Sequence, residues 1–333
     1  MITVVVPTRN ESRIVRGCLR ALRAQTMAPD QFEIVVVDNG SCDDTVAIAR
    51  EYTEQVFAFP GVTVGRLRNE GAKRARGSVL AFIDADCIAA PQWLDGALAA
   101  LADGGVAVGN KYDRPADARW IEALWLGDVP TGRHRTQELW AGNLVVGRDD
   151  FLACGGFDES LVSYEDVALS LALAKRGSLF LDDRVRVTHT GGPWSLAEFA
   201  RQQLWHGFEE WTVFRRGIGR DTFAPTMLCI VGYILLVLAL FALSAPTASR
   251  AIAFAVGAGL VLTATAWRLA RQTRSVHARN WRTLLRLGIL NFVCVSAKSA
   301  AVALRCFNLH WSGRRKTPKF DQDRQKASGA SRC

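Results

Sequence analysis

The segment from residue 1 to residue 103 alternates short apolar runs with segments of helical periodicity, and this alternation constrains the fold most strongly. The apolar runs are Ile2–Thr8, Phe32–Asp38 and Ser78–Ile83. They are rich in β-branched residues and lack polar alternation, which is typical of strands buried on both faces. Helical spacing is found in the segments 10–25, 43–53 and 91–103. A strand–helix–strand–helix order predicts an α/β fold in which helices cover both faces of a largely parallel sheet.

Acidic residues follow two of these predicted strands. Asp38 ends the second apolar run, and Asp84 and Asp86 come directly after the third, in the stretch AFIDADC. In such sheets, ligands bind outside the carboxyl ends of the strands. Two carboxylates one residue apart repel each other unless a cation lies between them, and carboxylates together with phosphate oxygens hold Mg²⁺ and Mn²⁺. Because Asp is also common in turns, the spacing alone leaves a surface turn as the alternative.

The charge of the chain is segregated along its length. Residues 1–221 carry 25 basic and 30 acidic side chains, whereas residues 222–333 carry 16 basic and only two acidic side chains. This basic C-terminal third indicates either nucleic-acid binding or a location at the cytoplasmic face of a membrane.

Two uncharged segments within this basic region are candidates for membrane-spanning helices. Residues 226–243 form an 18-residue run, and residues 251–267 form a 17-residue run rich in Ala and Gly. The arginines that follow them, with no acidic residue between, are Arg268, Arg271, Arg274, Arg279, Arg282 and Arg286. The positive-inside rule places this loop, and with it the N-terminal domain, in the cytoplasm. Because a membrane accounts for the basic residues, we expect no nucleic-acid partner.

A third apolar segment, residues 284–304, is open to two interpretations. Asn291, Lys298 and Arg305 recur every seven residues and share one helix face, as in an amphipathic helix that lies in the membrane interface or packs against protein. A third span would instead carry the following basic residues across the membrane, against the positive-inside rule. We expect residues 313–333 to form a disordered basic tail.

Five motifs occur in order over the first two thirds of the chain. They are VVVPTRNE (4–11), VVVDNGSCDDT (35–45), LRNEGAKRARGSVLAFIDADC (67–87), GNLVVGRDDFLACGGFDE (142–159) and YEDVALSLALAKRG (164–177). Together they resemble the family 2 glycosyltransferases of the membrane-associated bacterial type. The resemblance covers residues 1 to about 215 and implies the GT-A fold, a Rossmann-like α/β fold with a mixed sheet and helices on both faces.

The resemblance also implies a division into parts. A catalytic domain would occupy residues 1–220, with a nucleotide-sugar-binding half at 1–110 and an acceptor-binding half at 111–220. A membrane region at 221–312 would follow it.

A donor site at the strand ends is a further implication of the resemblance. The residues that match nucleotide-binding positions are Pro7, Thr8, Arg9, Glu11, Asp38, Ser41, Arg68, Asn69, Gly71 and Asp84. Asp84 and Asp86 match the DxD motif, whose first Asp lies near the ribose and whose second ligates Mg²⁺ or Mn²⁺. His189 matches a late histidine that some GT-A enzymes use as a further metal ligand, and a structural histidine is the alternative.

The resemblance assigns the catalytic base to Asp166, with Glu165 beside it near the acceptor. An acidic first turn of a helix is the alternative for this pair. Candidates for the acceptor pocket are Gly155, Gly156, Phe157, Gln202 and Trp205. For Trp205, a tryptophan buried between the domain and the membrane is the alternative. The arginine that precedes this tryptophan in processive synthases is missing, which argues against processive polymerisation.

The implied activity is that of an inverting glycosyltransferase. Asp166 would remove a proton from an acceptor hydroxyl as it attacks the anomeric carbon of a nucleotide-diphosphate sugar, in one metal-assisted displacement. The expected acceptor is a lipid-linked or membrane-embedded glycan at the cytoplasmic face of the inner membrane, in which the protein would be multi-pass. A catalytically degenerate membrane protein that only binds nucleotide sugar is the alternative. A dinucleotide-dependent oxidoreductase is excluded because no G-x-G-x-x-G follows the first predicted strand.

Overall fold

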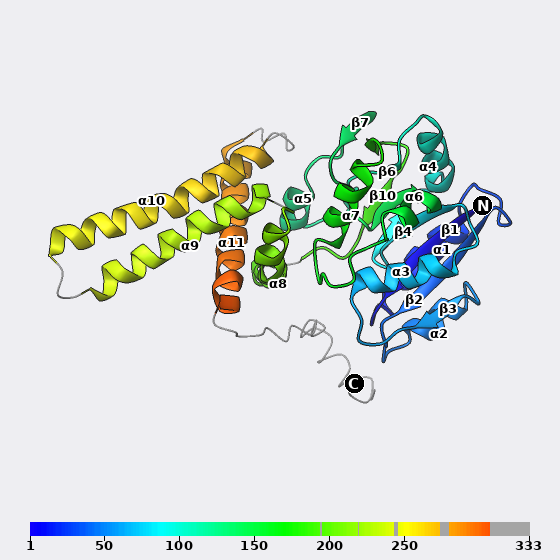
Figure 1. The fold of residues 1–333 in the computed structure, drawn as a ribbon, viewed down its shortest axis with the longest axis horizontal. Coiled ribbons are helices and arrows are strands. Elements are labelled where there is room, and N and C mark those ends of the chain that lie inside the picture. The colour runs from blue at the N-terminus through cyan, green and yellow to red at the C-terminus, as the bar shows by residue number, and fades with distance from the viewer. Residues whose placement is uncertain (194, 219, 243–245, 274–279, 307–333) are drawn as a thin grey trace.

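The computed structural model describes residues 1–193, 195–218, 220–242, 246–273 and 280–306. These residues form an N-terminal α/β domain and a group of long C-terminal helices beside it (Figure 1). The tail predicted at 313–333 lies outside the described residues, as do Arg274 and Arg279.

An eight-stranded mixed sheet forms the centre of the α/β domain. Its strands are β1 (Ile2–Thr8), β2 (Phe32–Asp38), β3 (Val56–Ala58), β4 (Val79–Ile83), β6 (Ala107–Gly109), β7 (Arg133–Thr136), β8 (Asn143–Gly147) and β9 (Leu179–Asp182). The three predicted strands are confirmed as β1, β2 and β4, which pair in parallel in the order β2-β1-β4. β8 pairs antiparallel with both β4 and β6, so the sheet is mixed. A separate antiparallel pair joins β5 (Cys87–Ala89) to β10 (Val187–His189).

Helices cover both faces of this sheet. One face carries α1 (Val15–Arg23), α2 (Thr45–Arg50) and α4 (Trp93–Ala102), and the other carries α3 (Val64–Arg74), α6 (Arg148–Ala153) and α7 (Glu165–Ala174). Successive residues of β1 divide between the two cores: Val4 and Val6 pack on the α1 side, and Val5 packs on the α3 side. This two-sided burial explains why the predicted strands are continuously apolar.

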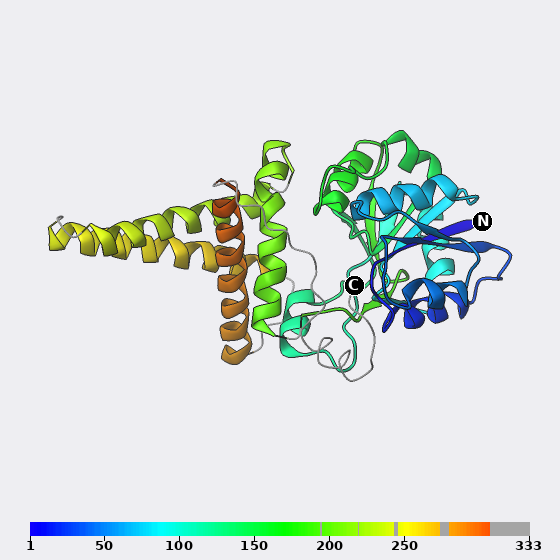
Figure 2. The same ribbon diagram turned by 90° about the horizontal axis from the view of Figure 1, so that it is seen from below.

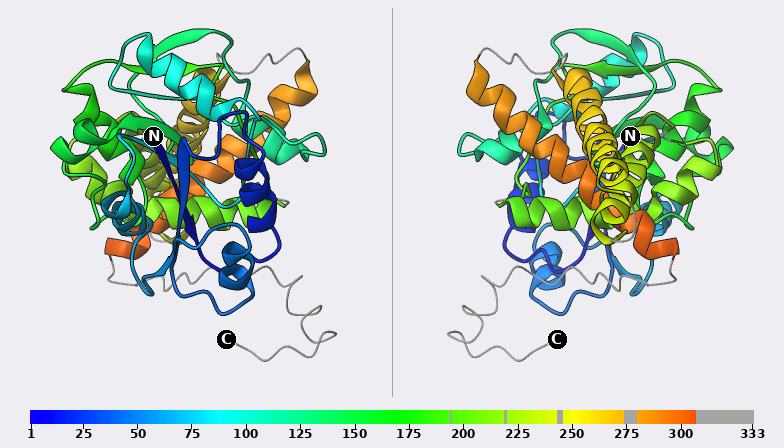
Figure 3. Two further views of the ribbon diagram at one scale, coloured as in Figure 1. Left: turned by 90° about the vertical axis from the view of Figure 1, so that its right-hand side faces the viewer. Right: turned by 90° about the vertical axis from the view of Figure 1, so that its left-hand side faces the viewer.

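Four long helices follow the α/β domain. They are α8 (Leu196–Arg215), α9 (Arg220–Phe241), α10 (Thr247–Gln272) and α11 (Trp281–Cys306). α9 and α10 form a hairpin that projects away from the α/β domain (Figures 1 and 2). α8 and α11 lie side by side across the base of this hairpin, between it and the domain. The end-on views in Figure 3 show the hairpin pointing away from the domain along the long axis of the molecule. A short helix of the domain, α5 (Trp120–Leu126), contacts α11 and so joins the α/β domain to the long C-terminal helices.

Three of these helices are long and apolar enough to cross a membrane, by length and composition. α9 and α10 overlap the two spans predicted at 226–243 and 251–267. α11 contains the ambiguous third segment, and half of its apolar window is buried inside the protein, compared with 17% for α10. Asn291 and Lys298, on its predicted polar face, are buried. This face therefore packs against protein, which was one form of the amphipathic interpretation.

Candidate active site

The carboxyl ends of β1 and β2 carry the first group of predicted nucleotide-binding residues. Thr8 and Asp38 are in register at the ends of these adjacent strands, and the Thr8 hydroxyl donates to Asp38 Oδ1 at 3.2 Å. The Ser41 backbone N–H donates to Asp38 Oδ2 at 2.7 Å, and the Ser41 hydroxyl donates to Oδ1. Pro7 is buried within β1. The structure thus brings Thr8, Asp38 and Ser41 together at one edge of the sheet.

Asn10, which was not predicted as a site residue, joins the loop after β1 to the loop after β2. Its backbone has a φ of +55°, its N–H donates to Ser41 Oγ at 2.8 Å, and its Oδ1 accepts from the Cys42 N–H at 2.9 Å. The side chain of Arg9 is exposed, and Glu11 is half-buried. The two loops therefore form one hydrogen-bonded rim beside the strand ends.

Arg68, in α3, connects the DxD motif with the predicted catalytic pair. Its guanidinium donates to Asp84 Oδ1 at 2.6 Å and to Glu165 Oε1 at 2.7 Å. The Arg68 side chain is only 4% exposed. A buried guanidinium is tolerated only with such partners. Three elements far apart in the sequence thus meet in one ionic network.

Asn69 has a structural position next to Arg68. Its Oδ1 accepts from the Phe157 N–H at 2.9 Å, and its Nδ2 donates to the Phe157 carbonyl at 2.9 Å. Gly155 and Gly156 have φ values of +79° and +73°, and a Cβ on Gly156 would lie 2.6 Å from Asn69 Oδ1. The predicted acceptor turn is therefore clamped onto α3. Gly71 instead packs against β1, since a Cβ there would lie 2.3 Å from Val5 Cγ1.

Asp86 faces His189, the other residue that was matched to a metal ligand. His189 Nε2 lies 3.5 Å from Asp86 Oδ2, and the other ring nitrogen, Nδ1, lies 3.9 Å from Glu122 Oε1. Neither Nδ1 nor this Glu122 oxygen makes a hydrogen bond within the described chain. The loop at Gly191 and Gly192 allows this approach, because a Cβ on each glycine would lie 2.2 Å from the Asp86 and Glu122 carboxylates respectively.

Glu122 is a site residue that the sequence did not reveal. It lies in α5, outside every matched motif, and burial raises its pKa above the usual range for glutamate. A carboxylate behind the second nitrogen of a metal-binding histidine fixes the tautomer and orientation of the ring. No spacing rule connects residue 122 with residue 189, so only the fold brings them together.

The donor atoms around the DxD motif fit a divalent metal ion that arrives with a phosphate ligand. Across the ranges that the structure describes, no three His, Cys, Asp or Glu side chains form a group able to hold a metal. Mg²⁺ is commonly bound through one or two carboxylates plus substrate phosphates, so such a group is not required. The carboxylates of Asp84 and Asp86 and the Nε2 atom of His189 are suitable donors for Mg²⁺ or Mn²⁺.

Asp166 lies in the first turn of α7 and has a raised pKa. Burial and the adjacent Glu165 carboxylate raise the pKa of Asp166 to about 7, while Arg68 and two backbone N–H groups act in the opposite direction. Because Arg68 holds Glu165 as an ion pair, the two neighbouring carboxyl groups have different surroundings. A carboxyl group with a pKa near neutral pH suits general-base catalysis.

Tyr112 is a second residue that the sequence did not reveal. Its ring stacks on His189 with the centroids 5.1 Å apart, and it lies 5.0 Å from the ring of Trp140. Burial and the Asp84 carboxylate raise the pKa of its phenol well above the usual range. Tyr112 therefore remains a neutral hydroxyl between the DxD motif and the acceptor half.

The two acceptor candidates from α8 lie in different surroundings. Gln202 is exposed, whereas Trp205 is half-buried with its ring 4.8 Å from that of His206. The neighbouring Gln203 is buried and accepts a hydrogen bond from Cys294 Sγ at 3.3 Å. Of these residues, Gln203 therefore faces α11.

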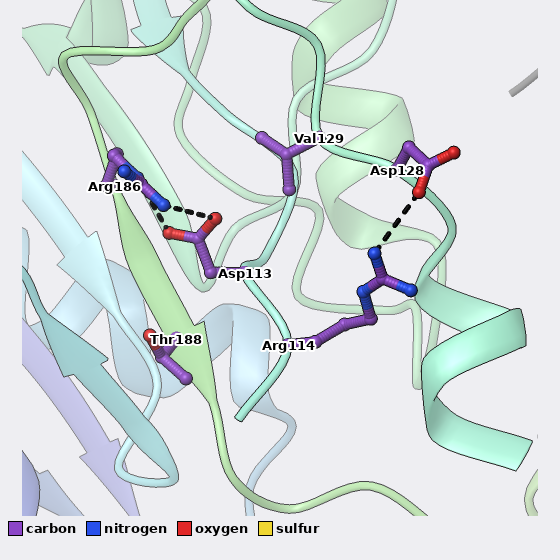
Figure 4. A pocket seen from close by; sticks show the side chains of 6 residues that line it. All are labelled: Asp113, Arg114, Asp128, Val129, Arg186 and Thr188. Atoms are coloured by element: carbon purple, nitrogen blue, oxygen red, sulfur yellow. Dashed lines mark hydrogen bonds and ion pairs between the residues drawn. The ribbon is translucent and has the colours of Figure 1, made fainter. Parts of the chain in front are cut away.

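A hollow of about 470 Å³ lies beside β10, which contributes Thr188 to its lining (Figure 4). Its lining residues are Asp113, Arg114, Asp128, Val129, Arg186 and Thr188. Figure 4 shows that both arginines are paired, Arg186 with Asp113 at 3.0 Å and Arg114 with Asp128 at 3.2 Å. Since its charges neutralise each other, this hollow offers no evident anion site.

The mixed sheet carries acidic residues at its strand ends and helices on both faces, as in the GT-A fold. The mannosyltransferase PcManGT from Pyrobaculum calidifontis, solved with GDP-Man and Mn²⁺, has this fold at a TM-score of 0.57 and 18% identity, covering 93% of this chain and 88% of that one. Residues 3–153 match the family described as Glycosyl transferase family 2. The similarity to glycosyltransferase family 2 is therefore carried by this N-terminal part of the chain.

Two curated relatives extend the comparison. Validoxylamine A glucosyltransferase from Streptomyces hygroscopicus subsp. limoneus is 31% identical over 219 residues, which cover 53% of this chain and 48% of that protein. Glycosyltransferase AglE from Haloferax volcanii is 26% identical over 264 residues, which cover 70% of this chain and 81% of that protein. The chain spans about half the length of the validoxylamine A glucosyltransferases that it matches.

Proposed function

We propose that this protein is an inverting, metal-assisted glycosyltransferase that moves a sugar from a nucleotide-diphosphate sugar to a hydroxyl of a lipid-linked or membrane-embedded glycan. The observation that carries the proposal is the position of Asp166, whose pKa is about 7. Its neighbour Glu165 is joined through Arg68 to the DxD residue Asp84. A base suited to neutral pH and a diphosphate-binding motif thus belong to one network.

The donor would bind at the rim formed by the loops after β1 and β2. Asp38, already oriented by Ser41 and Thr8, would contact the nucleobase of the donor, and Asp84 would lie near the ribose. Relatives named as glycosyltransferases and the GDP-Man in the solved structure of the same fold support a nucleotide-sugar donor in general.

Asp86, His189 and Asp84 would hold Mg²⁺ or Mn²⁺ at the DxD motif. When bound, the ion neutralises the negative charge that develops on the departing nucleotide diphosphate. Glu122 would orient His189 from behind, as a carboxylate commonly does for a metal-binding imidazole.

Asp166 would act on the acceptor. It accepts the proton of the acceptor hydroxyl while that oxygen bonds to the anomeric carbon and the bond to the diphosphate breaks. Burial and the adjacent Glu165 carboxylate, which is paired with Arg68, raise the pKa of Asp166 to a value that suits this role. The turn at Gly155, Gly156 and Phe157, held by Asn69, would shape the acceptor pocket.

The proposed membrane location is supported by the residues at the ends of α10 and α11. Arg268 and Arg271 lie in the last turns of α10, and Arg282 and Arg286 lie in the first turns of α11. The end of α10 lies on the side of the α/β domain (Figure 1). Trp281 is 67% exposed beside them. Arginines with exposed tryptophans at one level are typical of the cytoplasmic interface of a membrane protein. We therefore place the catalytic domain on the cytoplasmic side of an inner membrane.

The test is transfer by the full chain in membranes, measured as nucleotide release from a panel of UDP-, GDP- and dTDP-sugars. Release that needs both Mg²⁺ or Mn²⁺ and added membrane lipid would support the proposal. Asp166→Asn keeps the shape of the side chain but removes the base, and should lower transfer by roughly 10²–10⁴-fold with donor affinity unchanged. Asp149→Asn, the same change at an exposed position in the first turn of α6, is the control and should behave like wild type.

Two results would count against the proposal. Tight binding of a nucleotide sugar without transfer to any lipid fraction would favour the degenerate binding protein. Full activity of Asp166→Asn would place the base elsewhere, with Glu165 the next residue to test.

A further inference from the structure

The residue directly before the catalytic pair has an unusual backbone conformation. Tyr164 has a φ of +66°, in the left-handed region that residues with a Cβ rarely adopt. It forms the N-cap of α7, and its carbonyl accepts the Ala168 N–H at 3.0 Å. Such a conformation persists where the surroundings hold it. The direction in which α7 starts, and with it the place of Glu165 and Asp166, thus depends on what holds Tyr164.

The side chain of Tyr164 is held from the membrane region. Lys298 Nζ, from α11, donates to the Tyr164 hydroxyl oxygen at 2.7 Å and to Glu210 Oε1, from α8, at 2.8 Å. Lys298 is 6% exposed and Glu210 is 1% exposed. Three elements therefore meet in a buried polar cluster formed by Tyr164, Glu210 and Lys298.

The backbones of α8 and α11 approach closely at this cluster. A Cβ on Gly207, three residues before Glu210, would lie 2.7 Å from the Lys298 Cα and 2.8 Å from the Ala301 Cβ. Only glycine fits between the helices here, and this contact brings the Lys298 amine to the Glu210 carboxylate. A charged side chain in an apolar helix is costly, so Lys298 facing this cluster requires a specific role or partner.

We propose that Lys298 is a positioning residue that links the membrane helix α11 to the catalytic helix α7 through the Tyr164 hydroxyl. The inference rests on the proposed function, since it assigns the base to α7. By holding Tyr164 in its left-handed conformation, Lys298 fixes the first turn of α7 and hence the direction of the Asp166 carboxylate. The membrane region is then part of the catalytic apparatus as well as an anchor.

The test uses the full chain in lipid, with Tyr164→Phe as the first variant. This change keeps the ring and the Lys298–Glu210 pair but removes the oxygen that accepts from Lys298. We expect kcat to fall roughly ten- to a hundredfold, because a misplaced catalytic group costs about that much. The KM for the donor should stay within about twofold, since the rim formed by the loops after β1 and β2 is unchanged. The Ala168 amide, which bonds to the Tyr164 carbonyl, should exchange hydrogen faster than in wild type.

Tyr233→Phe is the matched control. The Tyr233 hydroxyl lies 2.6 Å from Ser296 Oγ, so the same substitution there removes a contact between α9 and α11 that does not reach α7. Its kcat and Ala168 exchange should equal those of wild type.

A second variant approaches the cluster from α11. Lys298→Met alone would leave the Glu210 carboxylate buried without a cation, so it is combined with Glu210→Gln. We expect the same loss of kcat, unchanged donor KM and faster Ala168 exchange.

Wild-type kcat and wild-type Ala168 exchange in Tyr164→Phe and in the Lys298→Met, Glu210→Gln variant would overturn the inference. If the wild-type chain transfers no sugar at all, the proposed function fails instead. Exchange at Ala168 then still decides the inference, because that measurement needs no activity.

Discussion

Asp84 and Asp86 are one residue apart, but they have different partners. Arg68 donates to Asp84 Oδ1 at 2.6 Å, whereas Asp86 Oδ2 lies 3.5 Å from His189. We therefore predict that Asp86→Ala abolishes metal-dependent binding of a nucleotide sugar, because it removes the carboxylate that faces the histidine. Titration calorimetry with and without Mn²⁺ measures this, with Asp95→Ala, an exposed acid of α4, as control. Metal-dependent binding that survives in Asp86→Ala would restore the interpretation of this motif as a surface turn.

The raised pKa of Asp166 predicts a pH dependence of the transfer rate. Below pH about 7 the carboxyl group is protonated and cannot accept the acceptor proton, so kcat should rise with pH and level off above about 7. The rising limb should be absent from the residual activity of Asp166→Asn. A wild-type pH–rate profile that is flat between about pH 5 and about pH 8 would contradict the assignment of Asp166 as the catalytic base.

The sequence predicted those site residues that the sheet positions by itself. Asp38 and Asp84 follow apolar runs, and the ends of parallel strands share one edge, so their place could be predicted from pattern alone. Glu122 and Tyr112 could not, because they reach the site only through the path of the chain between β6 and β8. Their neighbours in sequence give no periodic or motif signal.

At the scale of elements, α3 shows how one segment serves both packing and chemistry. Gly71 lets the helix lie against β1, and Arg68 and Asn69, on preceding positions, then reach Asp84 and the turn at Phe157. The motif containing these residues was matched to donor binding, but the contacts within the protein are with acidic and backbone groups. The strands β1, β2 and β4 and the helices α1, α2 and α4 were predicted correctly because their apolar periodicity reflects two-sided burial, whereas α3 itself was not predicted as a helix.

α11 was the element that the sequence left open. Its seven-residue polar repeat indicated one polar face, but sequence alone could not say whether water, lipid headgroups or protein would cover it. The structure covers it with protein, through Gln272 on Asn291 at 2.7 Å and Glu210 on Lys298 at 2.8 Å. Because α11 runs across the base of the α9–α10 hairpin, it lies along the membrane interface if that hairpin spans the bilayer (Figure 2).

At the scale of the whole molecule, the two hydrophobic cores beside the sheet are packed independently of the membrane helices. Every residue of the two cores beside the sheet lies between Ile2 and Val187. The contacts of α8 are divided, since Val213 packs with Leu161 of the domain while Phe199 packs with Leu290 of α11. Binding and catalysis should therefore respond differently to loss of the membrane region.

Truncation after Gly219 is the change that separates them. The shortened chain keeps both sheet cores, the nucleotide rim and the DxD motif, so it should stay folded and bind nucleotide with wild-type affinity in calorimetry. It loses Lys298, and Tyr164 loses its hydrogen-bond donor from α11. Transfer to a water-soluble glycan acceptor should therefore fall by roughly the factor expected for Tyr164→Phe, ten- to a hundredfold. Using a soluble acceptor removes membrane tethering as an explanation, provided that the full chain in detergent is assayed with the same acceptor. A truncated chain that unfolds would make α11 part of the domain core, and one with full activity would leave the membrane region as an anchor alone.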